Sequence, residues 1–164
     1  MQYMSGRFFP GFSGPLFPLA FLLISSQGTV HAQSANNEPN AHDRGLLAES
    51  FVKERLVIWQ QRLNLADWKI TIIMSHPSDL KPRTLGNIHW DADKKSAVIR
   101  VLDASEYKMT YHDMLDDMEF TVVHELIHLE LSSLPRSEAS RRDEEHAVNQ
   151  ITEALLKLDR GNRQ

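Results

Sequence analysis

Two histidines and a glutamate lie in one short segment, His124-Glu125-Leu126-Ile127-His128. Residues four apart on a helix differ by about 40° in direction and about 6 Å in height, so both imidazoles can aim at one point. Glu125 lies about 100° round from His124, which is unsuited to ligation but near enough to contact a water bound to an ion. The spacing therefore predicts a zinc site at His124 and His128, with Glu125 as the general base.

The competing interpretation is that these histidines are ordinary core residues. The chain has 164 residues and eight histidines, so a chance His-Glu-x-x-His segment is uncommon but not negligible. The flanking residues predict a helix that is buried on most sides. Its apolar positions are Phe120, Val122, Val123, Leu126, Ile127, Leu129, Leu131 and Leu134. Two histidines and a carboxylate on such a helix would be costly to desolvate without a partner, and a metal ion supplies one.

A catalytic zinc needs a third protein ligand and an open position for water. The last predicted helix offers Glu144 and Glu145, which reach the height of His128 if the two helices form an antiparallel hairpin. Glu145 is favoured because, like the histidines, it lies beside the main apolar face of its helix, and Glu144 is the alternative. Asn149, one turn beyond Glu145, is expected to support a ligand histidine by a hydrogen bond.

The elements that must position these residues follow from the spacing of apolar and β-branched residues. Helices are expected over residues 46–63 and 112–134, and a final helix is expected from near Ser137 or Ser140 to Leu158. Strands are expected over residues 68–74, 85–90 and 96–102. The sequence predicts an α+β fold with an N-terminal helix, a three-stranded antiparallel sheet, an active-site helix and a final antiparallel helix.

The N-terminal region has the pattern of an export signal. Arg7 is the only charged residue before Glu38, an apolar stretch covers residues 16–24, and Val30-His31-Ala32 provides small residues at a cleavage site. We expect a signal peptide over residues 1–32, cleaved after Ala32, and an exported protein, periplasmic or secreted. A membrane anchor is the alternative, although the apolar stretch is well short of the roughly 20 residues of a spanning helix. A misassigned start codon is the third interpretation.

After cleavage, residues 33–44 are polar and predict a flexible leader, followed by one domain over residues 45–160. We expect no stable membrane span in that product. The chain contains no cysteine, which excludes disulfides and thiolate zinc ligands, so any metal must be held by His, Asp or Glu. The formal net charge of −4 gives no indication of a nucleic-acid partner.

His124-Glu125-Leu126-Ile127-His128 on one helix and Glu145-x-x-x-Asn149 on the next resemble the gluzincin clan of metallopeptidases. The chain is most similar to compact members, the ImmA/IrrE-type and SprT-like proteins, over roughly residues 68–158. The resemblance implies a zincin-like fold in which an edge strand borders the cleft. It also implies zinc held by His124, His128 and Glu145, with Glu125 as the base. Metzincins are disfavoured because no histidine follows His128 at their short spacing.

The expected function is therefore that of a zinc-dependent peptidase acting on a peptide or protein substrate. Two alternatives remain: a non-proteolytic module that zinc stabilises for partner binding, and a zinc hydrolase of a non-peptide amide. The compact relatives work mostly inside cells, so the predicted export signal is a departure from them, and their biological roles are not transferred. The sequence does not single out an oxyanion stabiliser among Tyr107, Tyr111, His112, Arg142 and His146.

Overall fold

The computed structural model describes residues 38–135 and 138–162. The helices and strands in these residues are α1 (Ala41–Arg62), β1 (Lys69–Ser75), β2 (Gly86–Asp91), β3 (Ser96–Leu102), α2 (Tyr111–Glu130) and α3 (Glu138–Asn162). Short 3-10 turns cover Pro77–Asp79, Ala104–Glu106 and Leu131–Ser133. The α+β class predicted from the sequence is confirmed. The predicted signal peptide over residues 1–32 lies outside the described residues.

Helix α1 begins earlier than the sequence predicted. Asn40 caps it, with the side-chain oxygen accepting a hydrogen bond of 3.0 Å from the backbone N–H of Asp43. Such a cap satisfies one of the free N–H groups in the first turn of a helix. The predicted flexible leader over residues 33–44 therefore overlaps α1 in its last four residues, because the Asn40-x-x-Asp43 cap starts the helix within this polar segment.

The sheet is mixed, so the prediction of a purely antiparallel sheet is wrong. The strand order is β1-β3-β2, with β3 parallel to β1 and antiparallel to β2. Strands β2 and β3 form a hairpin through the short polar turn at residues 92–95. The connection from β1 to β2 is longer and contains Pro77 and Pro82, so it can cross to the far side of β3. Strand β2 is consequently an edge strand.

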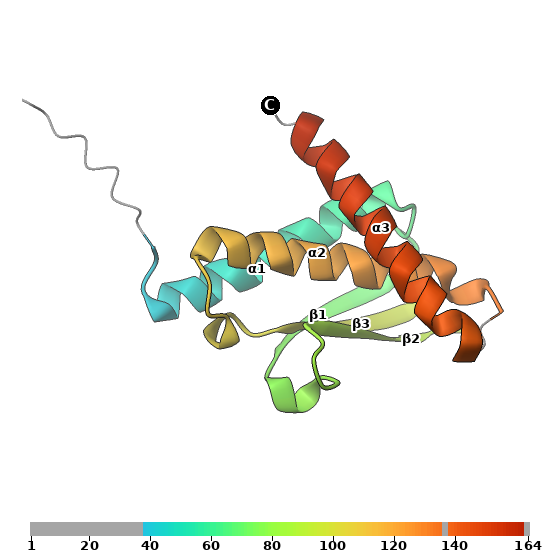
Figure 1. Ribbon diagram of the computed structural model, residues 1–164, viewed down its shortest axis with the longest axis horizontal. Helices are drawn as coiled ribbons and strands as arrows, with labels where there is room; N and C mark the ends of the chain where they lie inside the picture. Colours follow the sequence, from blue (N-terminus) through green and yellow to red (C-terminus); the bar gives the residue numbers. More distant parts are fainter. Residues whose placement is uncertain (1–37, 136–137, 163–164) are drawn as a thin grey trace, which may run out of the picture. The chain divides into compact units, whose positions relative to one another are not determined.

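Helices α1 and α2 pack against the sheet, and α3 runs back across α2 at an oblique angle (Figure 1). On β3, Ala97, Ile99 and Val101 are buried, and Val98 and Arg100 between them are half-buried, as the two-residue period of a strand requires. Helix α2 contacts α1, the sheet and α3, so it is buried on most sides, as predicted. Among the described residues, no helix combines the length and apolarity needed to cross a bilayer.

The ends of the last two helices differ slightly from the prediction. Helix α2 ends at Glu130 and continues as a 3-10 turn, after which Leu134 is 56% exposed rather than part of the core. Helix α3 begins at Glu138, which agrees with the earlier of the two predicted starts and places Ser140 inside the helix. The short connection between the two helices brings the start of α3 back beside the end of α2.

Candidate metal centre

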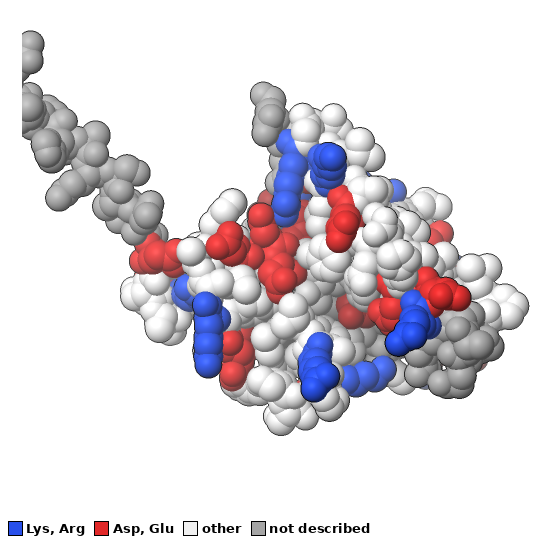
Figure 2. Space-filling view, in the orientation of Figure 1, with Lys and Arg blue, Asp and Glu red and all other residues white. Residues whose placement is uncertain are grey.

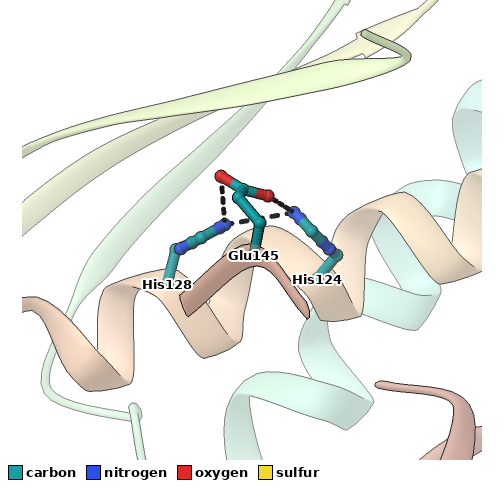
Figure 3. Close-up of side chains that lie close together, drawn as sticks. All are labelled: His124, His128 and Glu145. Carbon is teal, nitrogen blue, oxygen red and sulfur yellow. Dashed lines mark hydrogen bonds and ion pairs between the residues drawn. The ribbon is translucent and has the colours of Figure 1, made fainter. Parts of the chain in front are cut away.

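His124 and His128 lie one turn apart on α2, and Glu145 lies near the start of α3 (Figure 3). The two imidazoles point toward one another, and the carboxylate of Glu145 faces both of them. The histidine side chains are 16% and 11% exposed, whereas Glu145 is 51% exposed, so the group opens toward solvent on the side of α3. The structure thus brings together the three side chains that the sequence predicted as ligands.

The distances among the three donor groups can be compared with the geometry of zinc. The two Nε2 atoms are 3.1 Å apart, and Glu145 oxygens lie 3.5 Å from Nε2 of His124 and 3.4 Å from Nε2 of His128. In a tetrahedral site with bonds of about 2.0–2.1 Å, any two donors are about 3.3–3.4 Å apart. Each pair is therefore spaced much like two donors of a zinc tetrahedron, with Oε2 of Glu145 facing His124 and Oε1 facing His128. Among the described residues the group has no fourth donor, so one corner is left for another ligand.

Glu144, the alternative third ligand, lies on the opposite side of the His128 ring. Its Oε1 is 3.0 Å from Nδ1 of His128, whereas Glu145 faces Nε2. A carboxylate in that position accepts a hydrogen bond from Nδ1–H, which leaves the Nε2 lone pair available to a metal ion. The geometry favours Glu145 as the ligand and gives Glu144 the separate task of orienting His128, which the sequence reasoning did not foresee.

His124 lies in surroundings that keep it neutral. Desolvation by burial, followed by repulsion from His128, lowers its pKa below the usual value, while Glu145 and a polar contact from Asn149 act in the opposite direction. The ring of Phe120 stacks on the imidazole with 6.1 Å between centroids. Nδ1 of His124 is buried and has no hydrogen-bond partner among the described residues. A neutral imidazole is the form that binds a metal ion.

Glu125 is buried beside the ligands, with 7% of its surface exposed. Desolvation raises the pKa of its carboxyl to about 7, repulsion from Glu145 adds to the increase, and the cation of Lys81 opposes it. A carboxyl group with a pKa near the working pH can both accept and return a proton. These surroundings suit the role of general base that the spacing predicted.

Gly86 allows the edge strand to approach this part of α2. A Cβ atom at that position would lie 2.4 Å from Cγ2 of Thr121 and 2.8 Å from the carbonyl oxygen of Arg100. It would also lie 3.5 Å from Oε1 of Glu125. A Cβ atom only 2.4 Å from Thr121 would require a shift of the strand or the helix, so glycine at this position allows β2 to lie next to the predicted base.

The cluster lies in a cavity of about 930 Å³ between the sheet edge and the two helices. One wall is formed by β2 and the loop before it, and the other by residues of α2 and α3. The lining residues are Lys81, residues 83–90, Phe120, Thr121, His124, Glu125, His128, Glu144, Glu145 and Asn149. Within the described residues, none of the five residues considered as oxyanion stabilisers lines this cavity. The sequence analysis did not predict that Lys81, Arg83 and Gly86 line the site. The one signal for them in the sequence was Pro82, which indicates a turn between Lys81 and Arg83.

A second cavity, of about 670 Å³, lies on the other side of Phe120 between α2 and the C-terminal half of α3. In Figure 2, acidic side chains over α2 are bordered there by basic side chains near the end of α3. Asp116 forms an ion pair of 3.0 Å with Arg160. Within the part of the chain that the structure describes, His124, His128 and Glu145 are the one group of three donors close enough together to hold a metal ion.

Comparison of the chain with protein-family models, with curated proteins and with solved structures finds no match in any of the three.

Proposed function

We propose that this chain is a zinc-dependent peptidase of the compact gluzincin type, with the ion held by His124, His128 and Glu145. One observation supports the proposal most strongly. Two imidazoles and a carboxylate face one another at distances close to those between zinc ligands, in a cavity that also contains the buried carboxyl of Glu125. A purely structural zinc site would have a fourth protein ligand and would not need a base beside it.

Zn²⁺ bound at this site would supply a Lewis acid that polarises a carbonyl and lowers the pKa of a water molecule. The residues of the chain perform the remaining tasks. Glu125 takes the proton from the attacking water and returns it to the leaving amine. Glu144 fixes the orientation of the His128 ring through Nδ1, and Phe120 covers one side of His124.

The edge strand supports a peptide as the substrate rather than another amide. Strand β2 pairs only with β3 among the described residues, and its residues line the same cavity as the donor cluster. An extended peptide can add to such an edge through backbone hydrogen bonds that demand little of its sequence. Gly86 places the start of that edge against Glu125, so a peptide paired with β2 passes beside the base.

The proposal is tested with the purified protein and its Glu125→Gln variant, each loaded with zinc. Both are incubated with a mixed pool of peptides, and the new termini are identified by mass spectrometry. Termini produced only by the wild type support the proposal. An equal pattern for the two proteins contradicts it. Bound zinc without any cleavage favours the zinc-stabilised binding module, and turnover of a small amide but of no peptide favours the non-peptide hydrolase.

Export is a separate part of the proposal. It rests on the sequence pattern of residues 1–32 and is tested by sequencing the N-terminus of the protein recovered from cells. A mature chain that begins at Gln33 in the envelope or the medium supports it. A cytoplasmic chain that retains residues 1–32 contradicts it.

A further inference from the structure

The loop that leads into β2 contains a tight turn with an unusual residue at its third position. In Lys81-Pro82-Arg83-Thr84, the backbone N–H and the hydroxyl of Thr84 both donate to the carbonyl oxygen of Lys81, at 3.1 and 2.9 Å. Pro82 suits the second position of such a turn. Arg83 has a φ of 67°, a left-handed conformation for which glycine is favoured. The chain therefore has a guanidinium at a position where glycine would be less strained.

The cations of this turn lie on the wall of the cavity that contains the donor cluster. Both Lys81 and Arg83 line it, and the positive charge of Lys81 acts to lower the pKa of Glu125. Among the described residues, neither cation forms an ion pair. Lys94 in the turn between β2 and β3 differs, because it is paired with Asp91 at 2.6 Å. The two cleft cations are thus exposed to whatever enters the cavity.

The carboxylates that line the cavity face the histidines or are buried beside them, and within the described part of the chain they form no ion pair with Lys81 or Arg83. Glu144 faces Nδ1 of His128, Glu145 faces the two Nε2 atoms, and Glu125 is buried beside them. Three carboxylates and two cations line the cavity, so a bound divalent ion makes the lining positive overall. A positive cleft attracts anions, and Lys and Arg both form strong hydrogen bonds with carboxylates. In an unmodified peptide, the anionic groups are the carboxylates of acidic side chains and of the C-terminus.

We propose that Lys81 and Arg83 form a carboxylate-binding subsite of this cleft, so that the chain acts on peptides that carry a carboxylate near the scissile bond. The inference rests on the proposed function, and it names the substrate class of the same site. The carboxylate belongs either to an acidic side chain or to a free C-terminus. Lys81 supplies a point charge and Arg83 a planar fork of donors, which together hold and orient the group.

Binding without turnover is measured first, with the full chain carrying Glu125→Gln and loaded with zinc. Fluorescence anisotropy measures the binding of two matched pairs of peptides. In the first pair, both C-termini are amidated and the central residue is glutamate in one peptide and glutamine in the other. In the second pair, the peptide has no charged side chain and its C-terminus is free in one version and amidated in the other. The glutamate is placed at successive positions. In one of the two pairs, we expect the peptide with the carboxylate to bind about 10-fold more tightly than its neutral partner. The pair that shows this preference identifies whether the carboxylate belongs to a side chain or to the C-terminus. Equal binding in both pairs overturns the subsite.

The variants Lys81→Gln and Arg83→Gly test the two cations directly. Each is expected to remove about 10-fold of the affinity for the preferred peptide and to leave zinc content unchanged. Arg83→Gly relieves the left-handed strain, so its loss of binding cannot be attributed to unfolding. Lys94→Gln is the matched control because its cation is paired with Asp91 outside the cavity. Variants that bind as tightly as the parent protein overturn the proposal.

The subsite and the proposed function fail in different ways. If the carboxylate preference depends on Lys81 and Arg83 but the wild type cleaves none of the peptides, the subsite stands and the peptidase assignment fails. If the wild type cleaves acidic and neutral peptides with equal KM, and the two variants leave KM unchanged, the peptidase assignment stands and the subsite fails.

Discussion

Helix α2 contributes buried polar side chains to two clusters of opposite character. In the first, Glu119 accepts hydrogen bonds from Nε of Arg55 at 2.6 Å and from Nε1 of Trp59 at 2.8 Å. Arg55 also pairs with Asp159 at 3.1 Å, and Arg62 with Asp159 at 2.6 Å. Two cations and two carboxylates from three helices therefore balance one another within the protein.

The second cluster lies one to two turns further along the same helix and is not balanced. Two imidazole Nε2 atoms and a carboxylate face one another, a neighbouring carboxyl group has its pKa raised to about 7, and Nδ1 of His124 has no hydrogen-bond partner among the described residues. Acceptor lone pairs directed at one point repel unless a cation lies between them. The comparison shows that the first cluster pairs its charges within the protein, whereas the second directs its donor groups at one point, as the proposed metal site requires.

The largest expected effect comes from breaking the balanced cluster. Glu119→Ala leaves the Arg55 guanidinium underpaired and Nε1 of Trp59 without its acceptor, so we expect a loss of about 3–5 kcal/mol in the free energy of unfolding. Urea denaturation of the zinc-free proteins measures it. His124→Leu in the same zinc-free state should change stability by less than about 1 kcal/mol, because it removes one of the facing lone pairs. A larger loss for His124→Leu than for Glu119→Ala contradicts the comparison.

Zinc should stabilise the protein only through the second cluster. At a free zinc concentration of about 100 times Kd, the free energy of unfolding rises by about 2.7 kcal/mol if only the folded state binds. Denaturation curves with and without zinc measure the increase. His128→Ala should abolish it, whereas Lys53→Gln, on the exposed face of α1, should retain it in full. A zinc-dependent increase that persists in His128→Ala would place the ion elsewhere.

The two neighbouring glutamates can be separated by zinc affinity. Glu144→Gln weakens the support of His128 and should raise Kd about 10–100-fold. Glu145→Gln removes a ligand and should raise Kd further. Competition with a chromophoric chelator measures both constants. The opposite order would make Glu144 the ligand and Glu145 its support.

The smallest effect concerns pH. Because the pKa of Glu125 is raised to about 7 in the folded protein from its ordinary value near 4.5, its contribution to stability is present below pH 4.5 and is lost as pH rises toward 7. Relative to Glu125→Gln, the zinc-free protein should be about 1–2 kcal/mol more stable at pH 5.5 than at pH 7. The lowered pKa of His124 acts in the opposite direction but is present in both proteins, so the difference between them isolates Glu125. A difference that does not change with pH contradicts the raised pKa.

The sequence predicted that His124, His128 and Glu145 lie together and missed the ion-pair network of Arg55 for one physical reason. His124, Glu125 and His128 lie within one turn of a helix, so helical geometry alone relates their positions. Arg55 and Glu119 lie 64 residues apart, and only the packing of α1 on α2 brings them together. Glu145 is intermediate, because a short connection between two helices fixes its height but not the direction in which it points.

The sheet shows the same limit. Apolar and β-branched segments bounded by turn residues located the three strands to within one residue, because these signals are local. It could not show that the connection over residues 76–85 crosses to the far side of β3, which makes the sheet mixed and places β2 at the edge. The position of Lys81 and Arg83 in the cavity follows from that crossing, so these two residues were missed together.

The most direct test of the account is the zinc content of the purified protein. After dialysis against zinc and then against metal-free buffer, elemental analysis should find one equivalent of zinc in the wild type and in Glu125→Gln. It should find almost none in His124→Ala, His128→Ala or Glu145→Ala, while circular dichroism shows that all five proteins are folded. Folded wild-type protein that retains no zinc, or three ligand variants that retain it undiminished, would contradict the central claim that these side chains hold one divalent ion.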